Sequence, residues 1–363
     1  MAHHPSHPHP ADDRPTDVAG EPPAERYRRW PKAELHLHLD GSLRPASALE
    51  LARERGLAEG GLSLAEMRDR LVAPAQCLDQ ADLLRAFDLP IALMQDRAAI
   101  ARVTHELVED VASDGTRYVE IRWAPALHLA GGLSLRESIA AVVDGAAAGA
   151  SATGVVVRLI AVALRSHAPE MSLAVAQEAV GFVGQGMVGF DFAGREADFP
   201  DVGPHMAAYE AARDGGLGIT IHAGEWGGAA QVRRALEAVA PMRIAHGAPA
   251  ADDPALMAEL RARGVTLDLC PTSNIQAAMY PTLADHPLPY LLRSGVPVTL
   301  STDDRTVSDL TLAREYANVS SVLGVTDAEL WQMNMHALRV AFLHHDESLR
   351  ASLIHEFEAF GAP

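Results

Sequence analysis

The sequence has 363 residues, of which 48% are hydrophobic and 21% are charged. This composition is typical of a globular chain with a large buried core, and α/β barrels of this length fold as one domain. A net charge of −18 argues against a nucleic-acid partner, because little positive charge is available to neutralise phosphates. Two cysteines are too few for a disulfide framework, and we find neither a signal-peptide core nor an apolar run of membrane-spanning length. We therefore expect a cytoplasmic protein without membrane attachment.

Residues 1–25 are rich in proline, histidine, aspartate and alanine and show no periodicity. Such a segment lacks the apolar surface needed to fold, so we expect a disordered tail. Its four histidines could hold a metal only loosely, because no rigid element supports them. Residues 26–363 are expected to form a single barrel domain.

From Pro31 onward, short apolar runs alternate with longer stretches of helical periodicity. The predicted strands are 33–38, 117–123, 155–164, 188–192, 217–222, 243–246, 265–270 and 297–301. Most are rich in valine, isoleucine and leucine without polar alternation, as expected for parallel strands buried on both faces. Apolar residues spaced three and four apart predict helices at 101–113, 134–150, 172–182, 204–214, 229–239 and 253–263. Eight strands alternating with helices predict a closed (β/α)8 TIM-type barrel.

Two segments exceed the simple repeat. About 80 residues separate the first two strands, far more than one crossover helix requires. The excess includes a helical pattern around residues 83–87 and is expected to cover the mouth of the barrel as a lid. After the eighth strand, residues 309–360 predict two or three C-terminal helices, one of them over 327–343.

Polar side chains lie at the ends of several predicted strands, where barrel enzymes place their catalytic groups. His36 and His38 are two residues apart in the first strand, so they share one face and can both reach one metal ion. His222 ends the fifth strand and Asp303 follows the eighth. Three imidazoles and one carboxylate predict one Zn²⁺ per chain, although iron, cobalt and manganese accept similar ligands.

Two further residues lie beside these predicted ligands. Glu225, three residues past His222, is a candidate general acid, although a carboxylate at a helix N-terminus is also favoured by the helix dipole alone. His246 ends the sixth strand and could orient or deprotonate a metal-bound water, or could instead be a buried histidine bonded to backbone. Since a bound divalent cation lowers the pKa of its water toward ~7, the set predicts a hydrolase.

Three motifs together resemble the adenosine deaminases of the amidohydrolase superfamily. They are His36-Leu37-His38-Leu39-Asp40-Gly41-Ser42, His222-Ala223-Gly224-Glu225 and Ser301-Thr302-Asp303-Asp304. Supporting matches are Phe87-Asp88, Tyr118-Val119-Glu120-Ile121-Arg122, Phe192-Ala193-Gly194 and Cys270-Pro271-Thr272-Ser273-Asn274. The resemblance covers roughly residues 30–345 with the motifs in order. The Pro-Cys-x-x-Cys signature of the other zinc deaminases, which act on bases in nucleic acids, is absent from the sequence.

The resemblance implies a zinc-dependent deaminase of a small-molecule purine nucleoside, adenosine or deoxyadenosine, in purine metabolism. His36, His38, His222 and Asp303 would hold the zinc. Glu225 would protonate the ring nitrogen N1 while hydroxide adds at C6, and His246 would assist the attacking water.

The resemblance also implies the substrate contacts. Asp304 would bond the purine N7 edge, and the backbone of Gly194 would meet N3. Asp40 would contact the ribose 5′-hydroxyl, and this residue type favours adenosine or deoxyadenosine. Leu84 and Phe87 would form an apolar wall that keeps water from the addition intermediate.

The chain departs from the family pattern at several positions. Arg195 stands where aspartate is common, Arg305 stands where proline is common, Ala245 replaces a glycine, and Trp226 follows Glu225. We expect Arg305 and Trp226 near the pocket mouth, where they would affect the sugar side of the substrate. The sequence does not predict the oligomeric state.

Three alternatives remain open. The nearest is a deaminase of a modified or 5′-substituted adenine nucleoside or another 6-aminopurine. A ring-opening amidohydrolase is disfavoured by Glu225 and by the absence of a suitable bridging lysine, since Lys32 is the only lysine. A non-catalytic binding barrel is disfavoured because every expected ligand and the acid are present.

Overall fold

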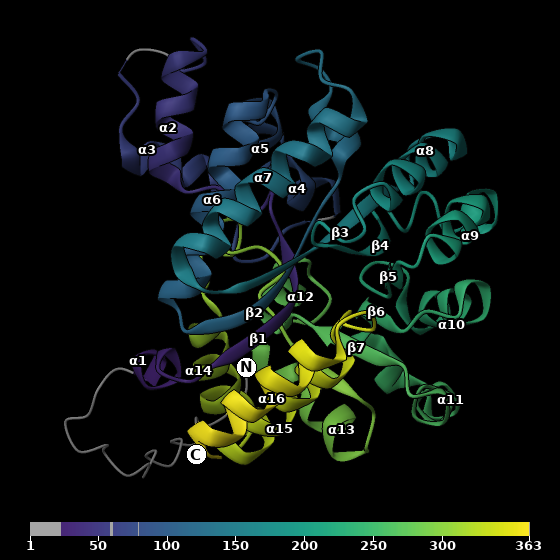
Figure 1. The fold of residues 1–363 in the computed structure, drawn as a ribbon. Helices are drawn as coiled ribbons and strands as arrows, with labels where there is room; N and C mark the ends of the chain where they lie inside the picture. Colours follow the sequence, from purple (N-terminus) through teal and green to yellow (C-terminus); the bar gives the residue numbers. More distant parts are fainter. Residues whose placement is uncertain (1–22, 59–60, 79, 363) are drawn as a thin grey trace, which may run out of the picture.

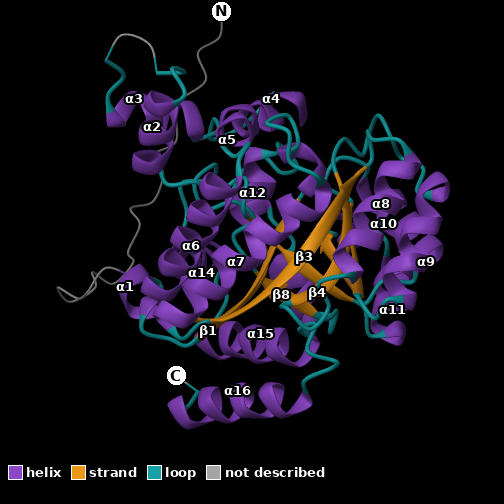
Figure 2. Ribbon diagram, turned by 45° about the horizontal axis from the view of Figure 1, so that its top comes forward, coloured by secondary structure: helices purple, strands orange, loops and turns teal. Residues whose placement is uncertain are grey.

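The computed structural model describes residues 23–58, 61–78 and 80–362. Eight parallel strands form one sheet in the order β1 to β8, so each strand pairs with its neighbours in sequence. The strands are β1 Lys32–His38, β2 Thr116–Trp123, β3 Val156–Leu164, β4 Met187–Ala193, β5 Gly218–Ala223, β6 Arg243–His246, β7 Thr266–Leu269 and β8 Val298–Leu300. Figure 2 shows them at the centre with helices around them. The predicted (β/α)8 barrel is confirmed.

The barrel closes where the segment that follows β8 pairs in parallel with β1. The backbone N–H of Asp303 donates to the carbonyl of His36 at 3.0 Å, and the N–H of His38 donates to the carbonyl of Asp303 at 2.7 Å. The residues that join the two ends are thus three of the predicted metal ligands. Their relative positions are fixed by backbone hydrogen bonds as well as by their side chains.

Helices surround the barrel or lie at its two ends (Figure 1). They are α6 Arg97–Ser113, α7 Leu135–Thr153, α8 Pro169–Val180, α9 Met206–Asp214, α10 Gly228–Val239, α11 Pro254–Arg263, α12 Pro271–Gln276, α13 Leu288–Arg293, α14 Leu312–Leu323, α15 Asp327–Val340 and α16 Glu347–Phe360. Each of the six helical stretches predicted between strands overlaps one of these helices, and the C-terminal region forms three. Short 3₁₀ turns η2 Pro125–His128, η3 Gly203–His205, η4 Ala248–Asp252 and η5 Leu283–Asp285 join them.

The long connection after β1 folds into several short helices. These are α2 Pro45–Glu54, α3 Leu64–Leu71, α4 Gln80–Leu84, the 3₁₀ turn η1 Arg85–Phe87 and α5 Asp88–Leu93. They lie at the end of the barrel opposite α15 and α16 (Figure 1). Parallel strands point their carboxyl ends toward this insertion, so it lies where the predicted site residues gather. Its movement as a lid stays a prediction.

The N-terminal boundary differs slightly from expectation. The predicted tail lies outside the described residues as far as residue 22, but residues 23–25 begin helix α1 Pro23–Arg28. The rings of Tyr27 and Trp30 pack edge-on against Tyr316 of α14, with centroids 5.9 and 6.2 Å apart. This aromatic contact packs the segment from α1 to β1 against α14.

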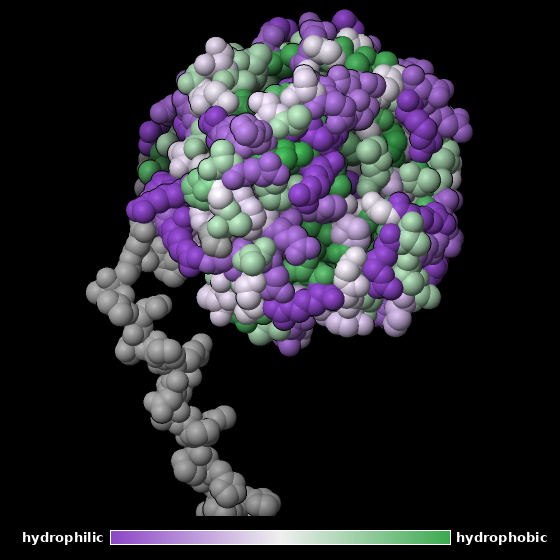
Figure 3. Space-filling model, turned by 60° about the horizontal axis from the view of Figure 1, so that its bottom comes forward, coloured by the Kyte–Doolittle hydropathy of each residue, from purple (hydrophilic) through white to green (hydrophobic). Residues whose placement is uncertain are grey.

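The surface is mixed in polarity. On the face shown in Figure 3, hydrophilic and hydrophobic residues are interspersed, as is usual for a surface in contact with water. Among the described residues, no helix combines the length and the apolar character needed to cross a membrane.

The inside of the barrel carries buried charges that the apolar strand patterns did not predict. Glu120, Arg122, Asp191, Arg243 and Asp268 are all fully buried. Arg122 donates to Asp191 at 2.9 Å, and Arg243 donates to Asp268 at 3.0 Å and also to Glu120. Burying a charge without a partner is costly, so each of these groups depends on its neighbours. The layer lies beneath the strand ends that carry the predicted metal ligands.

Candidate active site

A cavity of about 270 Å³ opens at the carboxyl ends of the strands. Its lining comprises residues from the insertion, from the strand ends and from the loops that follow them, with more apolar than polar surface. The lining residues with predicted roles are His38, Asp40, Leu84, Phe87, Gly194, His222, Glu225, His246, Asp303 and Asp304. Apolar walls with a few convergent polar groups are typical of small-molecule sites.

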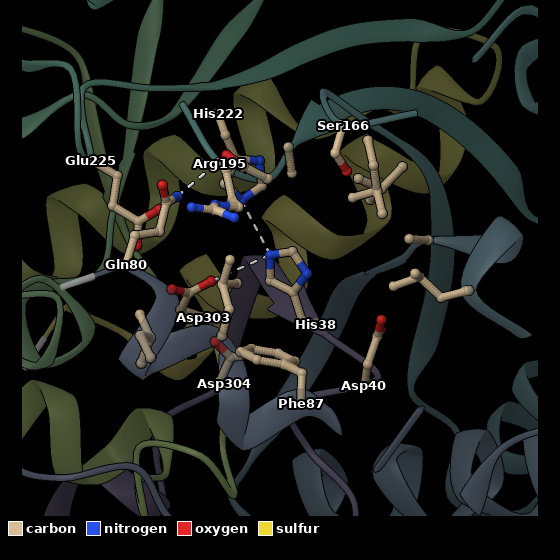
Figure 4. Close-up of a pocket in the computed structure, with 18 of the residues that line it drawn as sticks. His38, Asp40, Gln80, Phe87, Ser166, Arg195, His222, Glu225, Asp303 and Asp304 are labelled. Carbon is tan, nitrogen blue, oxygen red and sulfur yellow. Dashed lines mark hydrogen bonds and ion pairs between the residues drawn. The ribbon is translucent and has the colours of Figure 1, made fainter. Parts of the chain in front are cut away.

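The predicted metal ligands converge at the bottom of this cavity. Nε2 of His38 lies 3.3 Å from Nε2 of His36 and 3.2 Å from Nε2 of His222. Oδ1 of Asp303 lies 2.9 Å from Nε2 of His36 and 3.3 Å from Nε2 of His38. Figure 4 shows His38, His222 and Asp303 facing one another. Donor atoms of His36, His222, His246 and Asp303 also lie within 4.8 Å of one another, so His246 borders the same cluster.

Residues behind the cluster orient it. Nδ1 of His222 lies 2.9 Å from Oδ2 of Asp191, the carboxylate that also accepts from Arg122. Ser273 donates to Oδ2 of Asp303 at 2.6 Å, which leaves Oδ1 toward the histidines. Such outer contacts commonly fix the orientation of metal-binding side chains. Asp191 was not predicted as a site residue; the feature of the sequence that marks it is a single acid within the apolar strand predicted over 188–192.

The protonation states suit cation binding. Burial, with Arg122 nearby, lowers the pKa of His36 well below its usual value, and burial lowers the pKa of His38 to about 3. Burial alone would raise the pKa of Asp303, but the surrounding histidines hold this pKa well below its usual value. His36 and His38 are therefore neutral and Asp303 is ionised, which are the forms that bind metals.

Glu225 lies on a turn that is held by another buried acid. The carboxylate of Glu196 accepts backbone N–H groups from Gly224 at 2.9 Å, Trp226 at 2.9 Å and Gly227 at 2.8 Å. Burial and the nearby charge of Asp303 raise the pKa of Glu225 to about 8. At neutral pH, Glu225 thus holds a proton that it can donate into the cavity. The sequence analysis did not identify Glu196, which follows the unusual Arg195.

His246 and Asp303 both have backbone conformations that residues other than glycine seldom adopt. Their φ angles are 64° and 66°, in the left-handed region. Such strain, of order 1–3 kcal/mol each, persists where surrounding structure enforces it and is common at functional sites. Nε2 of His246 lies 3.8 Å from both Oε2 of Glu225 and Oδ2 of Asp303, and so points toward the reaction space.

Asp304 occupies space that exists because residue 41 is glycine. A Cβ on Gly41 would lie 1.7 Å from Oδ1 of Asp304. Burial and the charges of Asp303, Asp40 and Glu225 raise the pKa of Asp304 well above its usual value. Its Oδ1 has no hydrogen-bond partner among the described residues, so the carboxyl group is available to a ligand.

Asp40 lies on the other side of the histidine cluster from Glu225 (Figure 4). Burial raises its pKa to about 7, and its Oδ2 lies 4.0 Å from Nε2 of His128. Leu84 and Phe87 line the cavity from α4 and η1. Gly194, with a φ of 100° that favours glycine, accepts a hydrogen bond from Gln80 at 3.4 Å.

Two of the three unusual large residues border the cavity. Trp226 and Arg195 line it, and Arg195 pairs with Asp198. Arg305 does not line it, contrary to the expectation from its position in the motif. Its guanidinium points away from the cavity and lies 3.5 Å from Asp114 and 3.9 Å from Glu34, two buried acids. Arg305 is therefore not among the residues that line the cavity.

Comparison with known proteins gives one consistent family. The model of the adenosine deaminase family matches residues 31–358. An adenosine deaminase from Mycobacteroides abscessus is 39% identical over 339 residues, covering 88% of this chain and 92% of the relative. One from Clostridium perfringens strain 13 is 35% identical over 326 residues, covering 89% and 98%.

Solved structures share the whole fold. An adenine deaminase from Arthrobacter aurescens has a TM-score of 0.83 and 26% identity, covering 91% of this chain and 98% of its own. The N6-methyl-AMP deaminase from Arabidopsis thaliana has a TM-score of 0.81 and 27% identity, covering 93% and 99%. The relatives act on the amino group of adenine-type compounds, as their names state. Since the family model and the curated relatives span nearly all of the described barrel, the chain belongs to the adenosine deaminase family of hydrolases.

Proposed function

We propose that this chain converts adenosine and deoxyadenosine to inosine and deoxyinosine with release of ammonia, using one zinc ion per chain. The proposal depends chiefly on Glu225, a buried carboxylic acid with a pKa of about 8 beside a cluster of metal-binding donors. Attack at the aromatic C6 of a purine is difficult unless N1 gains a proton as the new bond forms. Glu225 is the group that can give this proton.

His36, His38, His222 and Asp303 would hold the zinc. Two donors on one tetrahedral zinc ion, each at roughly 2.0–2.1 Å, lie about 3.3 Å apart. The separations of 3.2 and 3.3 Å around Nε2 of His38 fit this spacing. His246 is assigned to the reacting oxygen instead, because its Nε2 lies 3.8 Å from Asp303. A zinc ion held by these residues would lower the pKa of a bound water enough to supply hydroxide at neutral pH.

The polar groups of the cavity match the acceptor nitrogens of adenine. N1, N3 and N7 of the ring all accept hydrogen bonds, so a recognising site must present donors. Protonated Glu225 can donate to N1, and Asp304, whose pKa is also raised, can donate to N7. The backbone N–H of Gly194 can donate to N3. As the oxygen adds to C6, the proton of Glu225 moves to N1. The proton of the added hydroxyl then moves to the amino group, the C6–N bond breaks, and ammonia leaves while C6 becomes a carbonyl.

The sugar end favours a nucleoside over a nucleotide. Asp40 and Asp88 line the cavity, and Arg195 is the one arginine or lysine among its described lining residues. Arg195 already pairs with Asp198. A 5′-phosphate beside Asp40 would meet a carboxylate rather than a cation, whereas a 5′-hydroxyl could donate to it.

A second candidate is a deaminase of a 5′-substituted adenine nucleoside or another 6-aminopurine. The observation that favours it is Arg195, which lines the cavity where the family commonly has an acidic residue. The names of the structural relatives, an adenine deaminase and an N6-methyl-AMP deaminase, show that this fold serves more than one such substrate.

The test is ammonia release by the zinc-loaded protein with adenosine, deoxyadenosine, adenine, AMP and 5′-deoxyadenosine. We expect the highest kcat/KM with adenosine and deoxyadenosine. Asp40→Asn should lower kcat/KM for adenosine by about tenfold and leave that for 5′-deoxyadenosine nearly unchanged. Equal losses for both substrates would remove Asp40 from recognition of the 5′-hydroxyl. Turnover of AMP or adenine in preference to adenosine would overturn the nucleoside assignment while keeping the deaminase chemistry.

A further inference from the structure

The two ring nitrogens of His246 have different surroundings. Nε2 faces the reaction space, 3.8 Å from Glu225 and from Asp303, which is too far for a hydrogen bond to either. Nδ1 faces the other way, 3.1 Å from the side-chain amide of Asn274. A neutral imidazole carries one proton, and the nitrogen that holds it decides whether His246 donates or accepts in the reaction space.

The proton positions can be traced from a backbone amide whose role is fixed. The N–H of Leu288 donates to Nδ1 of His286 at 3.2 Å. A backbone N–H only donates, so Nδ1 of His286 must accept and carries no proton. His286 is buried, and burial lowers its pKa to about 3, so the ring is neutral near pH 7. Its single proton is therefore on Nε2.

The next link is Asn274. Nε2 of His286 lies 3.1 Å from Oδ1 of Asn274, and since this nitrogen donates, the carbonyl side of the amide must face it. The NH₂ group of Asn274 then faces Nδ1 of His246. An amide NH₂ only donates, so Nδ1 of His246 accepts and its ring proton lies on Nε2.

Helix α12 holds Asn274 in this orientation. Thr272 lies two residues before Asn274 in this helix. Its backbone N–H donates to the buried Glu315 at 2.8 Å, and its hydroxyl donates to the same side chain. The intervening residue Ser273 donates to Asp303 at 2.6 Å. The same turn thus positions both a predicted zinc ligand and His246.

We infer that Asn274 and His286 are positioning residues that keep the proton of His246 on Nε2, so that His246 donates a hydrogen bond to the oxygen adding at C6 and does not act as its base. The identity of that oxygen rests on the proposed function. Hydroxide supplied at neutral pH needs a donor to orient it rather than a base. Of the two catalytic roles that the sequence left open for His246, orienting the water and deprotonating it, only the first is retained.

The tautomer can be observed directly in the zinc-loaded protein labelled with ¹⁵N-histidine. The His246 signals are those lost in His246→Gln. In the wild-type protein we expect a proton-bearing Nε2 and an unprotonated Nδ1. In Asn274→Ala and in His286→Ala, both tautomers of His246 should appear, because the relay, the hydrogen-bonded chain from His286 through Asn274 to His246, no longer selects one. A proton on Nδ1 of His246 in the wild-type protein would overturn the inference.

Kinetics test the donor role separately. The amide nitrogen of glutamine can replace Nε2 as a donor, whereas that of asparagine reaches only the position of Nδ1, and neither can act as a base. We expect His246→Gln to keep at least about a tenth of the wild-type kcat, while His246→Asn and His246→Ala lose about 100- to 1000-fold. Equal losses in all three variants would mean that His246 acts as a base.

The relay makes one more demand. Asn274→Ala should lower kcat with little change in KM in the wild-type background, and should have little effect on kcat in His246→Gln, which has no tautomers. An equal effect in both backgrounds would assign Asn274 a purely structural role. If the wild-type protein deaminates no adenine compound but shows the Nε2 proton, the proposed function fails and the tautomer assignment stands. If it deaminates adenosine with the proton on Nδ1, the tautomer assignment alone fails.

Discussion

Gly41 and Asp304 give a direct test of how the site accommodates its substrate. A Cβ built on Gly41 would lie 1.7, 2.4 and 2.8 Å from Oδ1, Cγ and Cβ of Asp304. The Gly41 backbone cannot easily retreat, because its carbonyl accepts the N–H groups of Thr306 at 2.9 Å and Val307 at 3.1 Å. In Gly41→Ala, the Asp304 side chain must therefore leave its position, and we expect its proposed contact with the purine to be lost.

The expected size of the effect follows from that one contact. Leaving a buried acceptor such as N7 without its hydrogen bond costs about 1–3 kcal/mol, which corresponds to roughly 5- to 150-fold in kcat/KM for adenosine. Zinc content should be unchanged, since neither residue is a predicted ligand. Steady-state ammonia release and metal analysis of the purified variant measure both quantities.

A double-mutant cycle gives the outcome that would refute this reasoning. Asp304→Ala removes the group with which the new methyl collides, so adding Gly41→Ala to it should cost little more. If the two losses instead multiply, Gly41 acts through something other than Asp304. If Gly41→Ala alone is fully active, Asp304 does not hold the substrate from its observed position.

Three further predictions concern the metal, the acid and a buried carboxyl group. Glu225→Gln should keep its zinc by metal analysis but lose about 100- to 10,000-fold in kcat, because glutamine cannot protonate N1; near-normal turnover would mean that another group is the acid. Asp303→Ala should lose zinc while Asp304→Ala retains it, and equal zinc in both variants would contradict the ligand assignment. Burial raises the pKa of Glu315 from 4.5 to about 7, so the folded state holds this proton more tightly and stability falls as pH rises from about 4.5 to 7. As the pH rises from 5 to 8, the unfolding free energy of Glu315→Gln should therefore fall less than that of the wild-type protein, by up to about 3 kcal/mol. Denaturant titrations at each pH measure this difference, and equal falls in both proteins would mean that Glu315 does not hold the proton.

The barrel was predictable from sequence because its signals are local. Uninterrupted valine, isoleucine and leucine runs occur where parallel strands are buried on both faces, and helical periodicity fills the intervals. The spacing of His36 and His38 also carries its own geometry, since alternate residues share one face of a strand. The position of Arg305 was not predictable in this way. Its neighbours in sequence point into the cavity, but its side chain is drawn toward Glu34 and Asp114, which are distant in sequence.

The residues that hold the predicted metal ligands, Glu225 and His246 in place could not be predicted from the sequence for the same reason. Asp191, Glu196 and Asn274 act through partners that are distant along the chain. The Gly224 N–H donates to Glu196 and the Asn274 amide donates to His246, each across 28 residues. A lone polar residue at such a position is compatible with many environments until the fold brings its partner near. Once it does, the cost of burying an unpaired polar group makes each contact important for stability. The chemistry of this site therefore depends on residues whose importance appears only when the hydrogen bonds of the folded barrel are followed from one partner to the next.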